Sequence, residues 1–226
     1  LLMFGNNDLD NNTPVEITVG SEVINLNDSP DIISEAGTGY FSTSWTGGEI
    51  TPQLSHISIT NPNDHITWGA AYWQYFEDMD KIVSHNSPLS ISKKLFIETI
   101  TSSGTVLVPV DSNQILSPGD KIISRLIIIT DRNMEYIHLK NMRATTFEPA
   151  TPFSGYSYSG GLWYYKNITD VSTDFFIQYL NKGTYVLEYP LYVTQKGDFT
   201  NGIATIQSMY APEFAAHSSG LRIKVE

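Results

Sequence analysis

With 226 residues and a formal net charge of −11, the chain is long enough for one large or two ordinary domains, and we expect neither nucleic acid nor an anionic membrane surface as partner. It contains no cysteine, which excludes a disulfide scaffold, thiolate catalysis and cysteine-based zinc clusters. No apolar run approaches the roughly 20 residues that span a bilayer, so we expect no membrane contact.

The first residues predict the end of a helix. Leu1, Leu2, Met3 and Phe4 precede Gly5, and glycine tolerates the positive φ of a left-handed helix cap.

The first strands are predicted soon afterwards. Residues 15–19 alternate apolar and polar side chains, as a half-buried strand does, and residues 23–26 are expected to pair with them across Gly20 and Ser21. The same alternation returns at residues 57–59. Turn residues at 61–64 follow, before a long aromatic run that has no helix start signal.

The second half of the chain has strong strand and turn signals. Residues 121–129 form the strongest core strand, and its near-continuous apolar run makes Ile127 the expected buried position. Residues 117–120 predict a tight turn, residues 181–183 a hairpin turn, and the Gly- and Tyr-rich residues 151–161 a loop. The other predicted strands are residues 91–98, 106–110, 135–139, 162–165, 174–180, 184–194, 203–209 and 221–225.

This pattern predicts the fold class. About a dozen short strands separated by turns, with no convincing helix after Gly5, indicate an all-β fold of one or two antiparallel β-sandwiches. The composition shifts at residues 84–88, where polar turn residues follow the aromatic run, and we place the domain boundary there.

Two groups of acidic residues invite a chemical interpretation. Glu77, Asp78 and Asp80 contain the ligand type that calcium prefers, but no glycine-assisted turn gathers them, so a solvated acidic strand end is the preferred interpretation. Glu135 and His138 resemble an acid–base pair, but side chains three residues apart on a strand point to opposite faces.

Histidine and serine give no stronger signal. The histidines lie singly and lack the short spacings of metal sites, so we expect structural roles for all five. They are His56, His65, His85, His138 and His217. Ser157 sits in a run that resembles a nucleophile elbow, but Ser159 replaces the required glycine and a strand follows. We therefore expect no catalytic residue, no metal ligand and no cofactor.

The aromatic residues allow two interpretations. Thirteen tyrosines and four tryptophans could provide a stacking platform for sugar rings. Aromatic residues are also favoured in strands, which makes core and sheet-face positions the preferred interpretation for most of them.

Five segments carry a family resemblance. They are residues 68–78 (WGAAYWQYFED), 131–140 (DRNMEYIHLK), 182–189 (KGTYVLEY), 197–202 (GDFTNG) and 209–214 (MYAPEF). In this order and spacing they resemble the C-terminal region of bacterial α2-macroglobulins, especially those of the Bacteroidetes type. The resemblance extends from about residue 15 to the end of the chain.

The resemblance implies a domain organisation. Residues 1–14 would end a preceding helical, thioester-type domain, residues 15–85 would be the closing strands of a CUB-like domain, and residues 86–226 would be a macroglobulin-type β-sandwich. Family members look like protease traps, in which cleavage of a bait segment triggers rearrangement around the protease. Many also carry a Cys-Gly-Glu-Gln thioester, and neither that motif nor a bait segment occurs in this chain.

The resemblance also implies partners and a location. The partners would be the neighbouring thioester-type and macroglobulin domains of the same polypeptide and, through the full-length protein, target proteases. The location would be periplasmic or at the cell surface, with the parent protein a lipoprotein. The implied function is a non-catalytic docking module of a protease trap, and the alternative is an extracellular carbohydrate-binding or adhesion module.

One loop is singled out by the resemblance. Met209, Tyr210, Ala211, Pro212 and Glu213 follow a predicted strand, and the proline stops further pairing, so an exposed loop is expected. In thioester-bearing relatives the equivalent stretch looks like a lid, which would make Tyr210 the side chain that covers the thioester, with Met209 beside it. The alternative is that Tyr210 caps its own sandwich.

Overall fold

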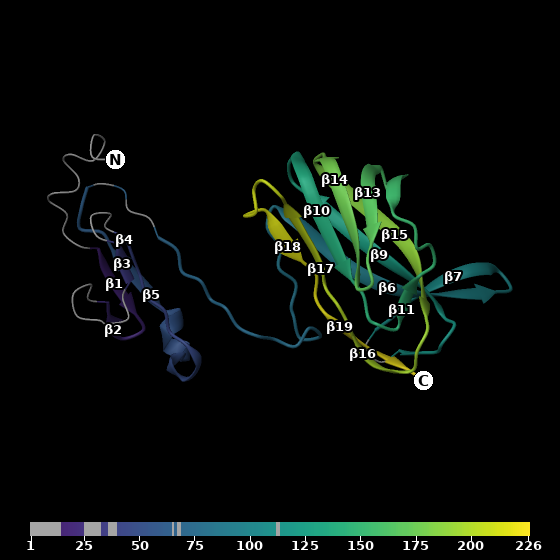
Figure 1. The fold of residues 1–226 in the computed structure, drawn as a ribbon, viewed down its shortest axis with the longest axis horizontal. Coiled ribbons are helices and arrows are strands. Elements are labelled where there is room, and N and C mark those ends of the chain that lie inside the picture. Colours follow the sequence, from purple (N-terminus) through teal and green to yellow (C-terminus); the bar gives the residue numbers. More distant parts are fainter. Residues whose placement is uncertain (1–14, 25–32, 36–39, 65, 67–68, 112–113) are drawn as a thin grey trace. The chain divides into compact units, whose positions relative to one another are not determined.

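The computed structural model describes residues 15–24, 33–35, 40–64, 66, 69–111 and 114–226. The chain divides into two compact units, Leu1–Gln74 and Tyr75–Glu226 (Figure 1). No helix among the described residues is long and apolar enough to cross a membrane. The helix end predicted at residues 1–5 lies outside the described residues.

The first unit contains a small antiparallel sheet. Strand β1 (Glu16–Val19) lies between β2 (Glu22–Val23) and β5 (Ile57–Thr60), which confirms the strands predicted at residues 15–19 and 57–59. β2 pairs with β1 across the predicted turn, and residues 25–26 of the expected strand are outside the described part. The remaining elements of this unit are the strand pair β3 (Ile33–Glu35) and β4 (Tyr40–Ser42) and the short 3-10 helices η1 (Gly47–Glu49) and η2 (Pro52–Ser55).

The second unit is a β-sandwich of two antiparallel sheets, in agreement with the predicted fold class (Figure 1). In spatial order the six-stranded sheet consists of β12 (Gly155–Ser159), β13 (Leu162–Ile168), β14 (Ser172–Leu180), β10 (Met134–Met142), β17 (Ala204–Ser208) and β18 (Ala215–His217). The five-stranded sheet consists of β11 (Phe147–Pro149), β15 (Gly183–Val193), β9 (Lys121–Thr130), β6 (Leu89–Thr101) and β7 (Gly104–Pro109). A third, three-stranded sheet consists of β16 (Gly197–Asn201), β19 (Leu221–Val225) and β8 (Ile115–Leu116), with β19 and β8 parallel.

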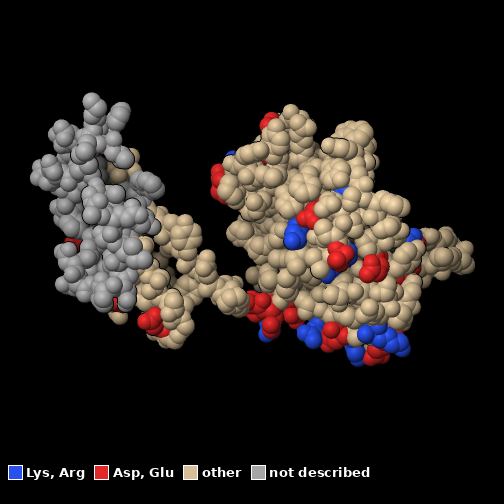
Figure 2. Space-filling view, viewed as in Figure 1, with Lys and Arg blue, Asp and Glu red and all other residues tan. Residues whose placement is uncertain are grey.

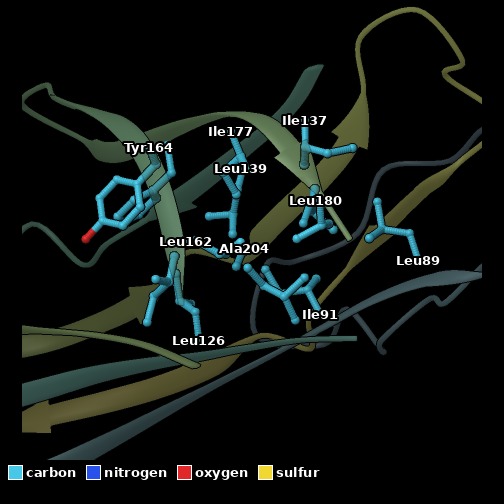
Figure 3. Close-up of a cluster of buried hydrophobic side chains, with 14 of the residues drawn as sticks. Leu89, Ile91, Leu126, Ile137, Leu139, Leu162, Tyr164, Ile177, Leu180 and Ala204 are labelled. Atoms are coloured by element: carbon cyan, nitrogen blue, oxygen red, sulfur yellow. The ribbon is translucent and has the colours of Figure 1, made fainter. Parts of the chain in front are cut away.

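The core lies between the two large sheets. Leu126 and Ile128 of β9 and Ile137 and Leu139 of β10 belong to one cluster of buried side chains. Figure 3 shows Leu126, Ile137 and Leu139 in this cluster. A second buried cluster includes Phe147 and residues of β6, β9, β15 and β19. Each sheet therefore buries one face, as the two-residue period of a strand requires.

The prediction for Ile127 is wrong. Burial alternates along β9, so that Leu126 and Ile128 are buried while Ile127 lies half-buried on the opposite face. The near-continuous apolar run suggested a strand covered on both faces, but here only one face of β9 meets the other sheet.

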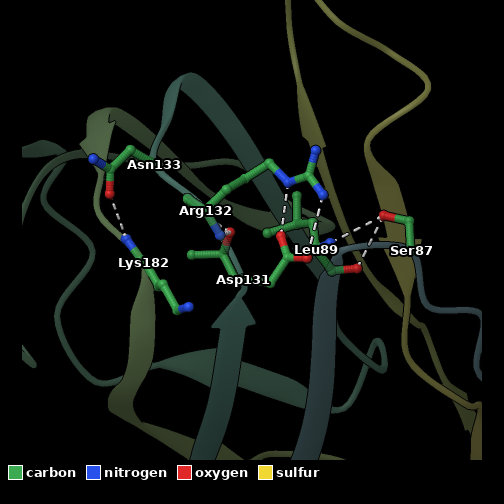
Figure 4. Close-up of polar contacts among 7 residues, drawn as sticks. Ser87, Leu89, Asp131, Arg132, Asn133 and Lys182 are labelled. Atoms are coloured by element: carbon green, nitrogen blue, oxygen red, sulfur yellow. Dashed lines mark hydrogen bonds and ion pairs between the residues drawn. The ribbon is translucent and has the colours of Figure 1, made fainter.

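Two other predictions in the second half of the chain are also wrong. A loop is predicted at residues 151–161, but β12 occupies 155–159 and pairs with β13. The turn at 181–183 is predicted to close a hairpin, but β14 and β15 lie in different sheets. The Lys182 backbone N–H donates a hydrogen bond of 2.8 Å to Asn133 Oδ1, which fixes the turn that carries the chain between the sheets (Figure 4).

The first residues of the second unit cover an edge of the sandwich. His85 pairs with His217 of β18 through two backbone hydrogen bonds of 3.0 and 2.9 Å, and the Gly220 N–H donates to the Ile82 carbonyl at 3.0 Å. The Ser87 hydroxyl then bonds the Leu89 backbone where β6 begins (Figure 4). We call residues 79–88 the edge-covering segment, because they occupy hydrogen-bonding groups that an edge strand otherwise exposes.

One lysine joins the two large sheets from inside. Lys93 of β6 donates hydrogen bonds to the carbonyl oxygens of Met142 and Gly202 at 2.5 and 2.6 Å, and to Asn201 Oδ1 at 3.3 Å. All three acceptors are uncharged oxygens. Burial lowers the pKa of Lys93 to about 7, because desolvation disfavours the ammonium form.

This buried lysine predicts a pH-dependent stability. Between about pH 7 and the ordinary lysine pKa of 10.5, the unfolded chain binds more protons than the folded chain, so folding becomes more favourable as pH rises. Relative to Lys93→Met, the free energy of unfolding of the unmodified chain should rise through this window by at most about 1.4 kcal/mol per pH unit. Urea unfolding at several pH values measures the difference. Lys94→Met, at the neighbouring exposed position, should not change the pH profile, and identical profiles for Lys93→Met and the unmodified chain would contradict the assignment.

Candidate functional site

The loop at residues 209–213 leaves the six-stranded sheet between β17 and β18 and is held firmly at its base. The Ser208 N–H donates to the Phe214 carbonyl at 3.1 Å, and the Phe214 N–H donates to the Ala211 carbonyl at 2.9 Å. The Met209 N–H donates to the carbonyl of Tyr136 on β10 at 2.9 Å. Backbone hydrogen bonds thus join the two ends of the loop to each other and join the loop to β10.

An irregularity in β10 places a tyrosine beside this loop. Tyr136 has a φ of 52°, which is in the left-handed region that few residues other than glycine adopt. Met134 and Ile137 are both buried, so Glu135 and Tyr136 lie together on the exposed side of the strand. The Tyr210 ring meets the Tyr136 ring edge-on, with centroids 5.1 Å apart and an interplanar angle of 86°.

A second contact holds the far end of the loop. Phe214 is partly buried against the main core, and the Arg132 guanidinium lies over its ring at 5.3 Å from the centroid. Arg132 is oriented by Asp131, which accepts two hydrogen bonds of 2.7 and 3.2 Å (Figure 4). The side-chain hydrogen bond from Arg132 lowers the pKa of Asp131, and the charge of Arg132 adds to the effect.

The tip of the loop remains accessible. Tyr210 is 80% exposed and Met209 is 52% exposed, while Pro212 and Glu213 are also exposed. The Tyr210 ring and the Met209 thioether are therefore exposed to solvent, while backbone hydrogen bonds fix the two ends of their loop. Such an arrangement is suited to contact with a partner surface, because rigid exposed aromatics lose little conformational freedom on binding.

The other candidates from the sequence are not brought together into a catalytic arrangement. Ser157 lies on β12 and pairs with Tyr164 of β13. Glu135 and His138 do not bond each other. His138 Nε2 instead lies 2.9 Å from Asp174 Oδ1, and the Ser172 hydroxyl donates to the other oxygen of that carboxylate at 2.8 Å.

This His138–Asp174 pair could not be recognised from the sequence. The two residues lie on neighbouring strands, β10 and β14, and only the strand register brings them together. His138 also stacks on Phe176, with centroids 4.8 Å apart and an interplanar angle of 9°.

Two of the three acidic residues at 77–80, Asp78 and Asp80, pair with basic side chains. Asp78 accepts a hydrogen bond from Lys81 at 2.7 Å, and this bond, together with the lysine charge, lowers the pKa of Asp78. Asp80 lies 3.7 Å from Arg222. Within the described part of the chain, no group of three or more potential ligands could hold a metal ion.

Charge is unevenly distributed over the second unit. In Figure 2, acidic and basic side chains lie close together along the edge where β16 and β19 run, while much of the visible face is uncharged. Arg222 there bonds Asp198 through two nitrogens at 2.8 and 3.1 Å, and Lys224 lies 2.5 Å from Glu226. Such exposed pairs contribute little to stability.

Several aromatic side chains lie on the outer face of the six-stranded sheet. Tyr156 contacts Tyr165 at 5.1 Å with an interplanar angle of 69°, and Tyr158 contacts Trp163 at 5.2 Å with an angle of 45°. The rings are tilted against one another and do not form a flat surface.

Comparisons with known proteins point to one family. A family model described as "Bacterial Alpha-2-macroglobulin MG10 domain" matches residues 89–213. This match begins at β6 and ends with the exposed loop. No curated protein sequence matched the chain.

Solved structures of long proteins are similar to parts of the chain. Salmonella alpha-2-macroglobulin reacted with methylamine has 14% identity and a TM-score of 0.48, and the match covers 76% of this chain and 11% of that one. Native Escherichia coli alpha-2-macroglobulin, from domain MG7 to the C-terminus, has 12% identity and a TM-score of 0.48, with 76% and 29% covered. Escherichia coli alpha-2-macroglobulin activated by porcine elastase has 10% identity and a TM-score of 0.48, with 95% and 19% covered. The chain thus spans less than a third of each of these structures.

Proposed function

Because the MG10 model matches residues 89–213 of the 226, the chain belongs to the bacterial alpha-2-macroglobulin family, and we propose that it is a non-catalytic docking module of a protease-trapping protein. The observation that carries the proposal is the exposed, firmly based loop at residues 209–213, which lies within the matched span. Its partners would be the neighbouring thioester-type and macroglobulin domains of the same polypeptide. Contact with a target protease would be made by the whole protein.

The proposal includes a domain organisation and a location. Residues 15–85 would be the closing part of a CUB-like domain, and residues 86–226 would be the macroglobulin sandwich. The presence of two compact units supports a two-domain arrangement, although their division between Gln74 and Tyr75 precedes the proposed limit. A parent lipoprotein of the Bacteroidetes type, in the periplasm or at the cell surface, completes the proposal.

Tyr210 is proposed to shield a thioester on the neighbouring domain. Three features support this role: the side chain is exposed, its ring is oriented by Tyr136, and the loop is tied to β10. An aromatic ring can cover a reactive bond with apolar surface and still use its hydroxyl as a hydrogen-bonding group. Water and small amines would then reach the bond only after the domains separate.

Reaction of the full-length parent with methylamine tests this proposal. In a parent shown to contain a thioester, Tyr210→Ala should accelerate inactivation several-fold without lowering the melting temperature, because the exposed ring contributes little to its own sandwich. Tyr156→Ala is the matched control, since Tyr156 is equally exposed, at 82%, on a distant strand of the same sheet. Unchanged reactivity with a lowered melting temperature would instead make Tyr210 a cap of its own sandwich.

A carbohydrate-binding or adhesion module remains the alternative function. It rests on the exposed aromatic rings of β12 and β13, but their angles of 69° and 45° do not favour stacking on a sugar ring. Membership of the family favours the docking module.

A further inference from the structure

Two histidines that are far apart in the sequence face each other across the edge of the six-stranded sheet. His85 of the edge-covering segment and His217 of β18 are directly opposed in an antiparallel bridge. Opposed residues of such a bridge project their side chains to the same side, with Cβ atoms roughly 5 Å apart. The two imidazole rings have centroids 5.8 Å apart and an interplanar angle of 31°.

This separation is close to that of two histidines bound to one metal ion. With metal–nitrogen distances of about 2.0–2.1 Å and tetrahedral angles, the ring centroids would be about 5 Å apart. Rotation of the two side chains would close the difference. His85 is exposed and His217 half-buried, so the rings can rotate without disturbing the core.

The hydrogen bonding of His217 prepares one nitrogen as a ligand. Its Nδ1 lies 3.2 Å from the Ser218 carbonyl oxygen, which has no proton to donate, so Nδ1 carries the proton in this bond. The neutral ring then has its lone pair on Nε2. Metal-binding histidines are commonly oriented by this kind of bond from the second ring nitrogen to a backbone carbonyl.

The charges around the pair also permit a bound cation. Along the same register row, His217 is followed by Thr205 of β17 and then by Lys140 of β10. The lysine is therefore two strands from His217, roughly 10 Å, where salt screens much of its repulsion.

We propose that His85 and His217 bind a divalent transition-metal ion such as Zn²⁺, with water completing its coordination. Imidazole nitrogens prefer ions of this class to Mg²⁺ or Ca²⁺. A bound ion cross-links the edge-covering segment to β18 and so holds the chain that enters the sandwich against its edge. Sequence spacing predicted no such site, because the two residues become neighbours only through the fold.

Titration of the full chain with Zn²⁺ by calorimetry tests the site directly. The unmodified chain should bind one Zn²⁺, and either His85→Ala or His217→Ala should weaken binding by at least about tenfold, since each removes half of the protein ligands. His56→Ala is the control for unspecific binding by an exposed histidine and should leave the affinity unchanged. Mg²⁺ should give no heat.

Hydrogen exchange provides the second measurement. Zn²⁺ should slow exchange of the His85 and Gly220 backbone N–H groups in the unmodified chain, because both groups bond between the edge-covering segment and the chain around β18, and this contact opens less often when it is cross-linked. The conservative variant His85→Gln, which keeps a polar side chain of similar size, should fold and lose this effect. Zn²⁺ affinity and exchange that are the same in the unmodified chain, His85→Gln and His217→Ala would overturn the proposal.

Discussion

Replacement of Ile128 by alanine should lower the free energy of unfolding by about 2–5 kcal/mol, enough to unfold a marginally stable domain. Ile128 is 0% exposed and lies in the main core cluster between the two large sheets. Removing its three outer carbons leaves a cavity that the closely packed sandwich can fill only in part. Urea or thermal unfolding of the whole chain measures the loss.

The adjacent position supplies a control of identical chemistry. Ile127 is half-buried on the outer face of the same strand, so Ile127→Ala should cost only about 1 kcal/mol. Equal losses at both positions would mean that the outer face of β9 is as well covered as the inner face. That result would contradict the alternation of buried and half-buried side chains along β9.

Replacement of Gly160 by alanine should destabilise the tip of the β12–β13 hairpin. Gly160 has a φ of 60°, and a Cβ atom built there would overlap the carbonyl oxygen of Val186 on β15. Alanine must therefore adopt a left-handed backbone conformation and also push the hairpin away from β15, which belongs to the other large sheet. We expect the free energy of unfolding to fall by about 2–4 kcal/mol, which is the sum of backbone strain and overpacking.

The next residue separates these two effects. Gly161 has a φ of 81°, but its nearest neighbour would be the Tyr185 ring at 3.8 Å, so a Cβ atom has room. Gly161→Ala should show the backbone cost alone, about 1 kcal/mol, in the same unfolding measurement. If both variants lose equally little, the hairpin tip does not pack against Val186.

Local patterns predicted most strands but could not assign them to faces or sheets. The alternation at residues 15–19 and 57–59 identified β1 and β5, because period two is a property of the strand itself. Residues 155–159 also alternate, with Tyr156 and Tyr158 between small residues, and their glycine-rich surroundings hid this signal. The turn at 181–183 was recognised from its residues, but turn chemistry does not reveal which sheet receives the next strand.

The candidate loop was partly predictable and the histidine pair was not. Pro212, shortly after the strand predicted at residues 203–209, indicated that sheet pairing would stop there, and β17 ends at Ser208. The position of Tyr210 against Tyr136 depends on the irregular backbone of β10, for which the sequence has no glycine or other signal. His85 and His217 meet through a bridge between distant segments, and no spacing rule can detect such a pair.

The turn at residues 181–183 also has a consequence for the folding rate. It passes the chain from β14 in one sheet to β15 in the other, so neither sheet can be built from consecutive strands alone. β10 must pair with β14 and β17, and β9 must pair with β6 and β15. Each of these pairings closes a long loop, and the entropy lost in closing it must be offset by contacts that form only afterwards. Sandwiches with such non-local pairing fold in milliseconds to seconds, and their unpaired strand edges remain open to other chains during that time.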